Sequence, residues 1–126
     1  MSKQIVSTAS APAAVGPYSQ AIVSNGLVFC SGQIPLDPES GELVVGTVAD
    51  QTRRCMENLA AILEGAGSSL ANAVKVTAFL VDMGDFAEFN DAYGEFFGDE
   101  PPARATFAVA ALPRGAEVEI ECIAHL

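Results

Sequence analysis

Apolar and polar residues alternate in three stretches that are predicted to be strands. Residues 3–8 alternate weakly, and residues 21–24 and 27–31 flank Asn25-Gly26. Both positions of that dipeptide tolerate the positive φ of a tight turn, so it predicts a hairpin. Residues 73–81, AVKVTAFLV, are apolar or β-branched on both faces, which is typical of a central strand.

Two further segments have apolar residues at helical spacing. The first begins at Thr47, which stands three residues before Asp50 as in a capping box, and continues to Gly67. The second is predicted to be capped by Asp85 and to end at Gly98. An aromatic stripe along the second helix is interpreted as core: Phe86, Phe89, Tyr93, Phe96 and Phe97. The chain between strands 27–31 and 73–81 is long enough for a crossover connection through the first helix.

The stretch 101–124, PPARATFAVAALPRGAEVEIECIA, is predicted to form two strands joined by a Pro and Gly turn. Arg104 enters the first strand, which is apolar on both faces over residues 105–112. In the second strand, the acids of residues 117–121 alternate with aliphatic residues and therefore share one face. This row of acids is either a solvated edge or holds one carboxylate beside a cation for chemistry.

The order of elements predicts an α+β fold in which residues 1–126 form a single domain. Two helices would cover one face of a single layer of about six mixed strands. Three of those strands, at residues 27–30, 73–81 and 105–112, are apolar on both faces. Another copy of the chain is the simplest cover for the second face, so we expect a homo-oligomer.

Composition narrows the classes of partner. The net charge is -10, with no basic run longer than Arg53-Arg54, so neither nucleic acid nor an anionic membrane is expected as a partner. Three separated cysteines and one histidine make no zinc site. No apolar stretch reaches the roughly 18 residues of a membrane span. We therefore expect a cytoplasmic protein with reduced thiols.

The candidate chemistry centres on Arg104, because a guanidinium in an apolar strand is costly to bury unless it is paired. Either an acid such as Glu119 pairs with it, or it awaits an anionic ligand, and the residues leave both interpretations open. Its planar donors match a carboxylate at two points, so a small organic acid is the natural ligand class. Tyr18 follows a Pro and Gly loop, where it packs as a lid or presents its hydroxyl to a ligand. No Ser-His-Asp triad, phosphate loop or dinucleotide motif is present.

The segments GPYSQA, CSGQIPLDPESGE, VKVTAFLVDMGDFAEFN and PPARATFAVAALPRGAEVEIE resemble the RidA family, also called YjgF, the reactive intermediate (imine) deaminases. The resemblance implies a chorismate-mutase-like α+β fold and a homotrimer whose sheets line a central barrel, with active sites in the clefts between subunits. Family deaminases hydrolyse 2-imino acids and enamines to 2-ketoacids and ammonia without a cofactor or metal, a form of metabolite damage control. The implied substrates are 2-aminoacrylate, 2-iminopropanoate and 2-iminobutanoate.

The resemblance also implies roles for individual residues. Arg104 would clamp the substrate carboxylate, Glu119 would orient or deprotonate the attacking water, and Tyr18 would close the pocket from a neighbouring chain. Four further residues would border the cleft: Ser31, Gly32, Asn90 and Thr106. Thr106 stands where many family members carry cysteine, so a thiol at that position is not essential here.

The sequence leaves three alternative functions open. The same cleft could serve a non-catalytic, metabolite-binding or regulatory trimer. An RNA-directed activity, ascribed to some relatives, is disfavoured by the charge of -10. A chorismate mutase, suggested by fold analogy alone, would need more cations than the chain supplies.

Overall fold

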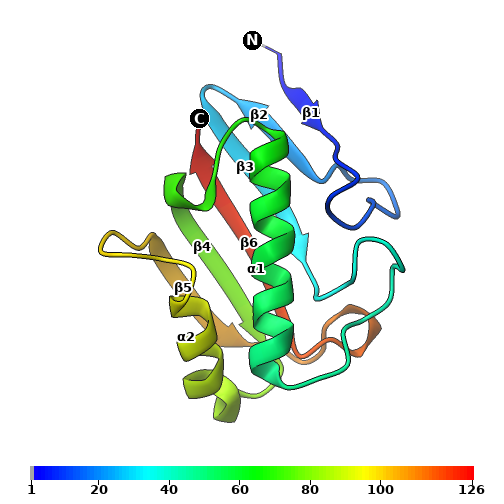
Figure 1. The fold of residues 1–126 in the computed structure, drawn as a ribbon, viewed down its shortest axis with the longest axis vertical. Helices are drawn as coiled ribbons and strands as arrows, with labels where there is room; N and C mark the ends of the chain where they lie inside the picture. Colours follow the sequence, from blue (N-terminus) through cyan, green and yellow to red (C-terminus); the bar gives the residue numbers. More distant parts are fainter. Residues whose placement is uncertain (1) are drawn as a thin grey trace.

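A single six-stranded sheet forms the body of the molecule, and both α-helices lie on one of its faces (Figure 1). The computed structural model describes residues 2–126. The strands follow the order β1-β2-β3-β6-β4-β5, and the predicted α+β class is confirmed. The strands are β1 (Gln4–Val6), β2 (Ala21–Ser24), β3 (Leu27–Gln33), β4 (Ala73–Leu80), β5 (Ala103–Ala108) and β6 (Val118–His125). The helices are α1 (Val48–Gly65) and α2 (Phe86–Gly94), and short 3-10 turns are η1 (Leu70–Asn72), η2 (Met83–Asp85) and η3 (Pro113–Gly115).

The N-terminal half folds as predicted. Asn25 and Gly26 have φ values of 53° and 76°, which are the two positive values of the tight turn expected between β2 and β3. Strands β3 and β4 are both antiparallel to β6, so they are parallel to each other. Helix α1 therefore provides the predicted crossover between them.

The predicted C-terminal hairpin is wrong. Strand β5 pairs with β4 in parallel, at the edge of the sheet, and β6 inserts between β3 and β4. The β5 strand also ends at Ala108 rather than at residue 112. The reason lies in burial: Val118, Ile120, Cys122 and Ala124 are each at most 3% exposed, so β6 is a central strand with a neighbour on each side. Strand β5 is instead reached from β4 through α2, a second crossover.

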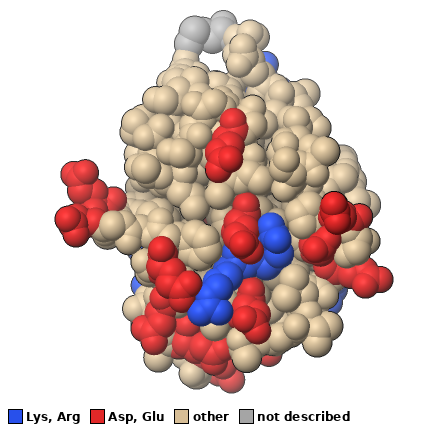
Figure 2. Space-filling model, in the orientation of Figure 1, with Lys and Arg blue, Asp and Glu red and all other residues tan. Residues whose placement is uncertain are grey.

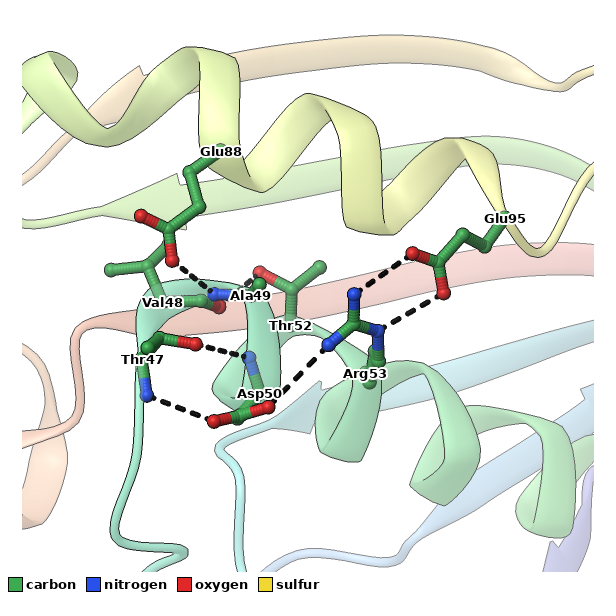
Figure 3. Close-up of polar contacts among 8 residues, drawn as sticks. All are labelled: Thr47, Val48, Ala49, Asp50, Thr52, Arg53, Glu88 and Glu95. Carbon is green, nitrogen blue, oxygen red and sulfur yellow. Dashed lines mark hydrogen bonds and ion pairs between the residues drawn. The ribbon is translucent and has the colours of Figure 1, made fainter.

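Helix α1 begins as predicted, whereas α2 does not. Thr47 Oγ1 accepts from Asp50 N at 3.1 Å, and Asp50 Oδ2 accepts from Thr47 N at 3.1 Å (Figure 3). Asp85 makes no side-chain cap, because it already lies within the turn of η2 with φ -89° and ψ 3°, outside the extended region of an N-cap. Asp82 caps η2 instead, accepting from Gly84 N at 2.8 Å, and α2 ends at Gly94, before Gly98.

Two polar contacts fix α2 against the first turns of α1 (Figure 3). Ala49 N, at the start of α1, donates to Glu88 Oε2 at 2.8 Å. Arg53 Nε and Nη2 donate to the two carboxylate oxygens of Glu95 at 3.0 and 2.9 Å. Both ion-pair partners are exposed, so the pair adds little to the free energy of unfolding. Its two-point geometry nevertheless defines where α2 lies.

The two faces of the sheet differ in what covers them. The helix face, on which α1 and α2 pack, holds a core that includes Val76, Ile120 and Leu59, each with no exposed surface. The open face carries Phe29 and Phe107, which are 41% and 45% exposed, and Phe107 packs edge-on against Phe79 with ring centroids 5.3 Å apart. This apolar open face is the feature on which the predicted homo-oligomer depends. Neither α1 nor α2 is long and apolar enough to cross a membrane.

Candidate active site

A cavity of about 430 Å³ lies beside the carboxylate of Glu119. Its polar walls come from Glu119 on β6, Gly32 and Gln33 at the end of β3, Tyr18 on the loop before β2, and Arg114 of η3. Its apolar walls are formed by Pro12, Ala13, Val15, Ile34, Leu36 and Pro113. The volume suits a small organic molecule.

Gly32 faces the Glu119 carboxylate without an intervening side chain. The β3–β6 ladder shifts register between Cys30 and Gln33, and this irregularity lies beside Glu119. A Cβ built at Gly32 would overlap Glu119 Oε2 and would lie 3.0 Å from its Cδ. Gly32, which was predicted to border the cleft, therefore leaves room for this carboxylate.

Replacing Gly32 with alanine is expected to displace the Glu119 carboxylate, because real Cβ atoms do not approach other atoms that closely. The imine deaminase activity that the sequence resemblance implies should fall at least tenfold, because raising the activation free energy by about 1.4 kcal/mol already gives that factor. The thermal midpoint and circular dichroism spectrum report whether the fold is kept. Gly98→Ala is a suitable control, because nothing lies within 4 Å of its added Cβ. Full activity in Gly32→Ala would contradict the close packing.

Glu119 is a half-buried carboxyl group, and none of the ion pairs among residues 2–126 includes it. Burial raises the pKa of Glu119 above its ordinary value of 4.5, and the charge of Glu121 on the same strand raises it further. A raised pKa makes the ionised carboxylate a stronger base toward water. The environment of Glu119 thus fits a general base.

The raised pKa of Glu119 predicts the direction in which the pH–rate profile is displaced. If the carboxylate form is the active one, the acidic limb of kcat/KM should lie above pH 4.5, the ordinary pKa. Glu121→Gln removes the like charge and is expected to move that limb to lower pH. A pH–rate profile of both proteins checks this. An unmoved limb would show that Glu121 does not influence the titrating group.

Tyr18 lies on the rim of the Glu119 cavity and is 51% exposed. Its hydroxyl accepts from Val15 N at 3.3 Å, so the ring folds back over its own loop. Ser31 Oγ donates to Ser19 O at 2.5 Å; the serine therefore anchors this loop beside Gly32. Tyr18 and Glu119 border the same cavity within one chain, so the expectation that Tyr18 approaches Glu119 from a neighbouring chain is not needed to bring these two residues together.

Arg104 lies on the other side of the sheet from Glu119. In the ladders, Arg104 is the partner of Val76, which is buried on the helix face, whereas Glu119 is the partner of Phe79. Cross-strand partners share a face, and residues 76 and 79 point to opposite faces. The expectation that Arg104 and Glu119 face each other is therefore not met within one chain.

The guanidinium of Arg104 lies over aromatic rings of α2. Its Cζ lies 4.8 Å from the ring centroid of Tyr93 and 5.6 Å from those of Phe86 and Phe89. Within residues 2–126, no ion pair involves this half-buried arginine. The sequence left two interpretations of Arg104 open. The structure does not show the first of them, in which Arg104 pairs with an acid of its own chain.

Two other predicted residues lie with Arg104. Thr106 is two positions further along β5 and shares its face, and Thr106 Oγ1 is buried without a hydrogen-bond partner among the described residues. Asn90 is exposed on α2 at helical spacing from Phe86 and Tyr93. The predicted site residues thus form two groups, one with Arg104 and one with Glu119. No cluster of three or more His, Cys, Asp or Glu side chains in residues 2–126 is placed to hold a metal ion.

Comparison with known proteins identifies the family. A family model described as Endoribonuclease L-PSP matches residues 8–126. The chain belongs to this family, the RidA (YjgF) family. The resemblance inferred from the sequence motifs is confirmed.

Individual RidA relatives match nearly the whole chain. A Bos taurus protein named 2-iminobutanoate/2-iminopropanoate deaminase is 48% identical over 122 residues, covering 97% of this chain and 89% of its own. The Arabidopsis thaliana chloroplastic Reactive Intermediate Deaminase A is 49% identical over 124 residues, covering 98% and 66%. The crystal structure of E. coli TdcF with bound serine superimposes with a TM-score of 0.93 at 41% identity, covering 98% of both chains.

Sequence reasoning about this RidA-family chain missed two features of the site. The aromatic stripe of α2 was assigned to the core alone, although its spacing, just before an arginine-bearing strand, could have indicated the contact with Arg104. Arg114 also lines the Glu119 cavity and donates through Nη1 to Gly41 O at 2.8 Å. Its φ of 60° belongs to a turn position that Asn or Gly usually fills, so pattern reasoning gave no sign of it.

Proposed function

We propose that this protein hydrolyses 2-imino acids and their enamine tautomers to 2-ketoacids and ammonia, in clefts between the subunits of a homotrimer. The observation that carries the proposal is the state of Arg104, a half-buried guanidinium that lies over aromatic rings and takes part in no ion pair of residues 2–126. Such a group is a preformed receptor for a carboxylate. RidA relatives that carry the deaminase name support the same activity.

The separation of Arg104 from Glu119 supports the assembly. Their side chains point to opposite faces of one sheet, so a ligand that contacts both needs two copies of the chain. The open face offers the exposed apolar surface that association would bury, including the exposed rings of Phe29 and Phe107. A closed ring of three copies would create three equivalent clefts, each with Arg104 of one copy and Glu119 and Tyr18 of the next.

The proposed reaction depends mainly on how the substrate and the attacking water are positioned. The substrate carboxylate binds the two-point donors of Arg104, which places the electrophilic C2 carbon of the iminium group near Glu119. The Glu119 carboxylate takes a proton from water as the water oxygen bonds to C2. The proton then passes to the substrate nitrogen. The C2–N bond breaks as Glu119 removes the remaining hydroxyl proton, so that the C2–O bond becomes a carbonyl, and that proton passes to the departing ammonia, which leaves as ammonium. Glu119 is ionised again at the end of the cycle.

The apolar walls of the cavity suit the uncharged side chain of such a substrate. Ile34, Leu36 and Pro113 lie in the same cavity as Glu119, so an aliphatic group on the substrate would be removed from water there. Burial of each CH₂ contributes about 0.8 kcal/mol. A four-carbon imino acid is therefore expected to bind more tightly than its three-carbon homologue.

Surface charge gives no support to RNA as a substrate, despite the description of the family model. On the helix face, basic side chains are interleaved with acidic ones (Figure 2). There Arg53 pairs with Asp50 and Glu95, and Arg54 pairs with Glu57. A polyanion needs a cluster of unpaired cations to displace its counterions.

The test of the proposal generates 2-aminoacrylate or 2-iminobutanoate in the cuvette with a serine/threonine dehydratase. The rate of ketoacid appearance is then measured with and without this protein. A concentration-dependent acceleration is expected, together with a trimer mass in analytical ultracentrifugation. Binding of 2-ketobutanoate without acceleration would favour the non-catalytic, metabolite-binding alternative. A stable monomer at micromolar concentration would contradict the assembly.

A further inference from the structure

We propose that the rings of Phe86, Phe89 and Tyr93 form a cradle, the α2 cradle, that positions the Arg104 guanidinium for carboxylate binding. This inference rests on the proposed function for its kinetic consequences, but not for its geometry. The three rings occur at positions i, i+3 and i+7 of one helix, which places them on one face. All three ring centroids lie within about 6 Å of the cation, the range of cation–π attraction.

The α2 cradle stabilises the cation without using its hydrogen bonds. A guanidinium has five N–H donors, and a cation–π contact attracts the cation without occupying the acceptor positions around those donors. An aspartate or glutamate partner would occupy the donor edge and compete with an incoming carboxylate. Aromatic faces therefore offset part of the cost of burying Arg104 and leave that edge available for a ligand.

The cradle is rigid because its parts are fixed independently. Phe89 has no exposed surface and Tyr93 is 5% exposed, and their ring centroids lie 5.5 Å apart. The contacts of Ala49 with Glu88 and of Arg53 with Glu95 hold α2 against α1. Little conformational entropy then remains to be lost when the guanidinium binds a ligand.

Phe86 offers the cleanest test, since it is only half-buried at the start of α2. In Phe86→Leu, volume and apolar character are largely kept while one ring face is lost. We expect KM for 2-iminobutanoate, and Kd for 2-ketobutanoate, to rise about threefold to tenfold, with kcat changed less than twofold. Phe86→Tyr, which restores a ring, should return both constants to within about twofold of the wild-type values.

A control variant separates ring faces from other effects. Phe96 is partly buried against the same core, but its ring is not among the three that lie over Arg104 in residues 2–126, so Phe96→Leu should leave KM unchanged. A rise in KM of the same size in Phe96→Leu would overturn the proposal, because it would assign the effect to general loosening.

A readout independent of activity keeps the cradle testable even if the proposed function fails. The Nε–H signal of Arg104 in a ¹⁵N–¹H NMR spectrum, assigned by its loss in Arg104→Lys, should be displaced by the ring currents of the cradle. Phe86→Leu should move that signal, and Phe96→Leu should not. An Arg104 signal at the same position in wild type and Phe86→Leu would refute the cradle. Absent deaminase activity with a displaced signal would instead refute only the proposed function.

Discussion

Replacing Arg104 with alanine is expected to lower kcat/KM for 2-iminobutanoate more than tenfold while the chain stays folded. Each charge-assisted hydrogen bond to the substrate carboxylate contributes about 1.5–3 kcal/mol, and truncation removes both. The dehydratase-coupled assay measures the loss, which should fall mainly on KM because the carboxylate is bound equally before and during reaction.

Arg54→Ala is the matched control for Arg104→Ala. It also removes a guanidinium, but one that pairs with Glu57 within α1 and does not hold α2, so near-normal turnover is expected. If Arg104→Ala keeps near-normal kcat/KM in a correctly assembled protein, Arg104 does not hold the substrate. The proposed reaction would then need another anion receptor.

Glu119→Gln is expected to lower kcat by about 10²-fold to 10⁴-fold, the usual contribution of a general base. The amide has the same shape as the carboxylate and keeps the packing against Gly32, so binding of 2-ketobutanoate should change little. Glu121→Gln, two positions along the same face of β6, should retain turnover at neutral pH. Wild-type kcat in Glu119→Gln would exclude this carboxyl group as the base.

The two variants together test where the site lies. If each cleft takes Arg104 from one copy and Glu119 from the next, mixing the unfolded Arg104→Ala and Glu119→Gln chains and refolding them should restore activity. In random trimers about a quarter of the clefts would then hold both native residues. No restoration, with mixed trimers shown by native mass spectrometry, would place both residues in a site of one chain.

The local signals of the sequence were sufficient for the elements and the fold class, because they act between near neighbours. Asn25-Gly26 specified its turn through positive φ, and the Thr47 and Asp50 capping box specified the start of α1. The predicted pairing of β5 with β6 was wrong because a Pro and Gly turn indicates a change of chain direction but does not determine which strand becomes the neighbour. Asp85 does not cap α2 because its backbone conformation is fixed by the preceding turn, η2.

The sequence indicates candidate residues for the site but not their geometry. Motif and composition could indicate these residues because the possible role of each depends on its residue type: Arg104, Glu119, Gly32 and Tyr18. Their distribution over two faces of the sheet depends on long-range register, which alternation within one strand does not reveal. The contact of Arg104 with α2 likewise depends on the second crossover, which brings β5 beneath the aromatic stripe.

The place of β6 in the sheet has a consequence for folding during synthesis. The ribosome makes β6 after all the other strands, yet β6 lies between β3 and β4 and pairs with both. Until residues 118–125 emerge, the nascent chain has no partner for one edge of each of those strands, and its apolar side chains remain accessible to water. Sheet closure is therefore expected to be late and dominated by contacts between residues far apart in the chain, which slows folding. A nascent chain arrested before Val118 should be a good substrate for chaperones and proteases, whereas one in which a linker added after Leu126 brings β6 out of the ribosome should resist them.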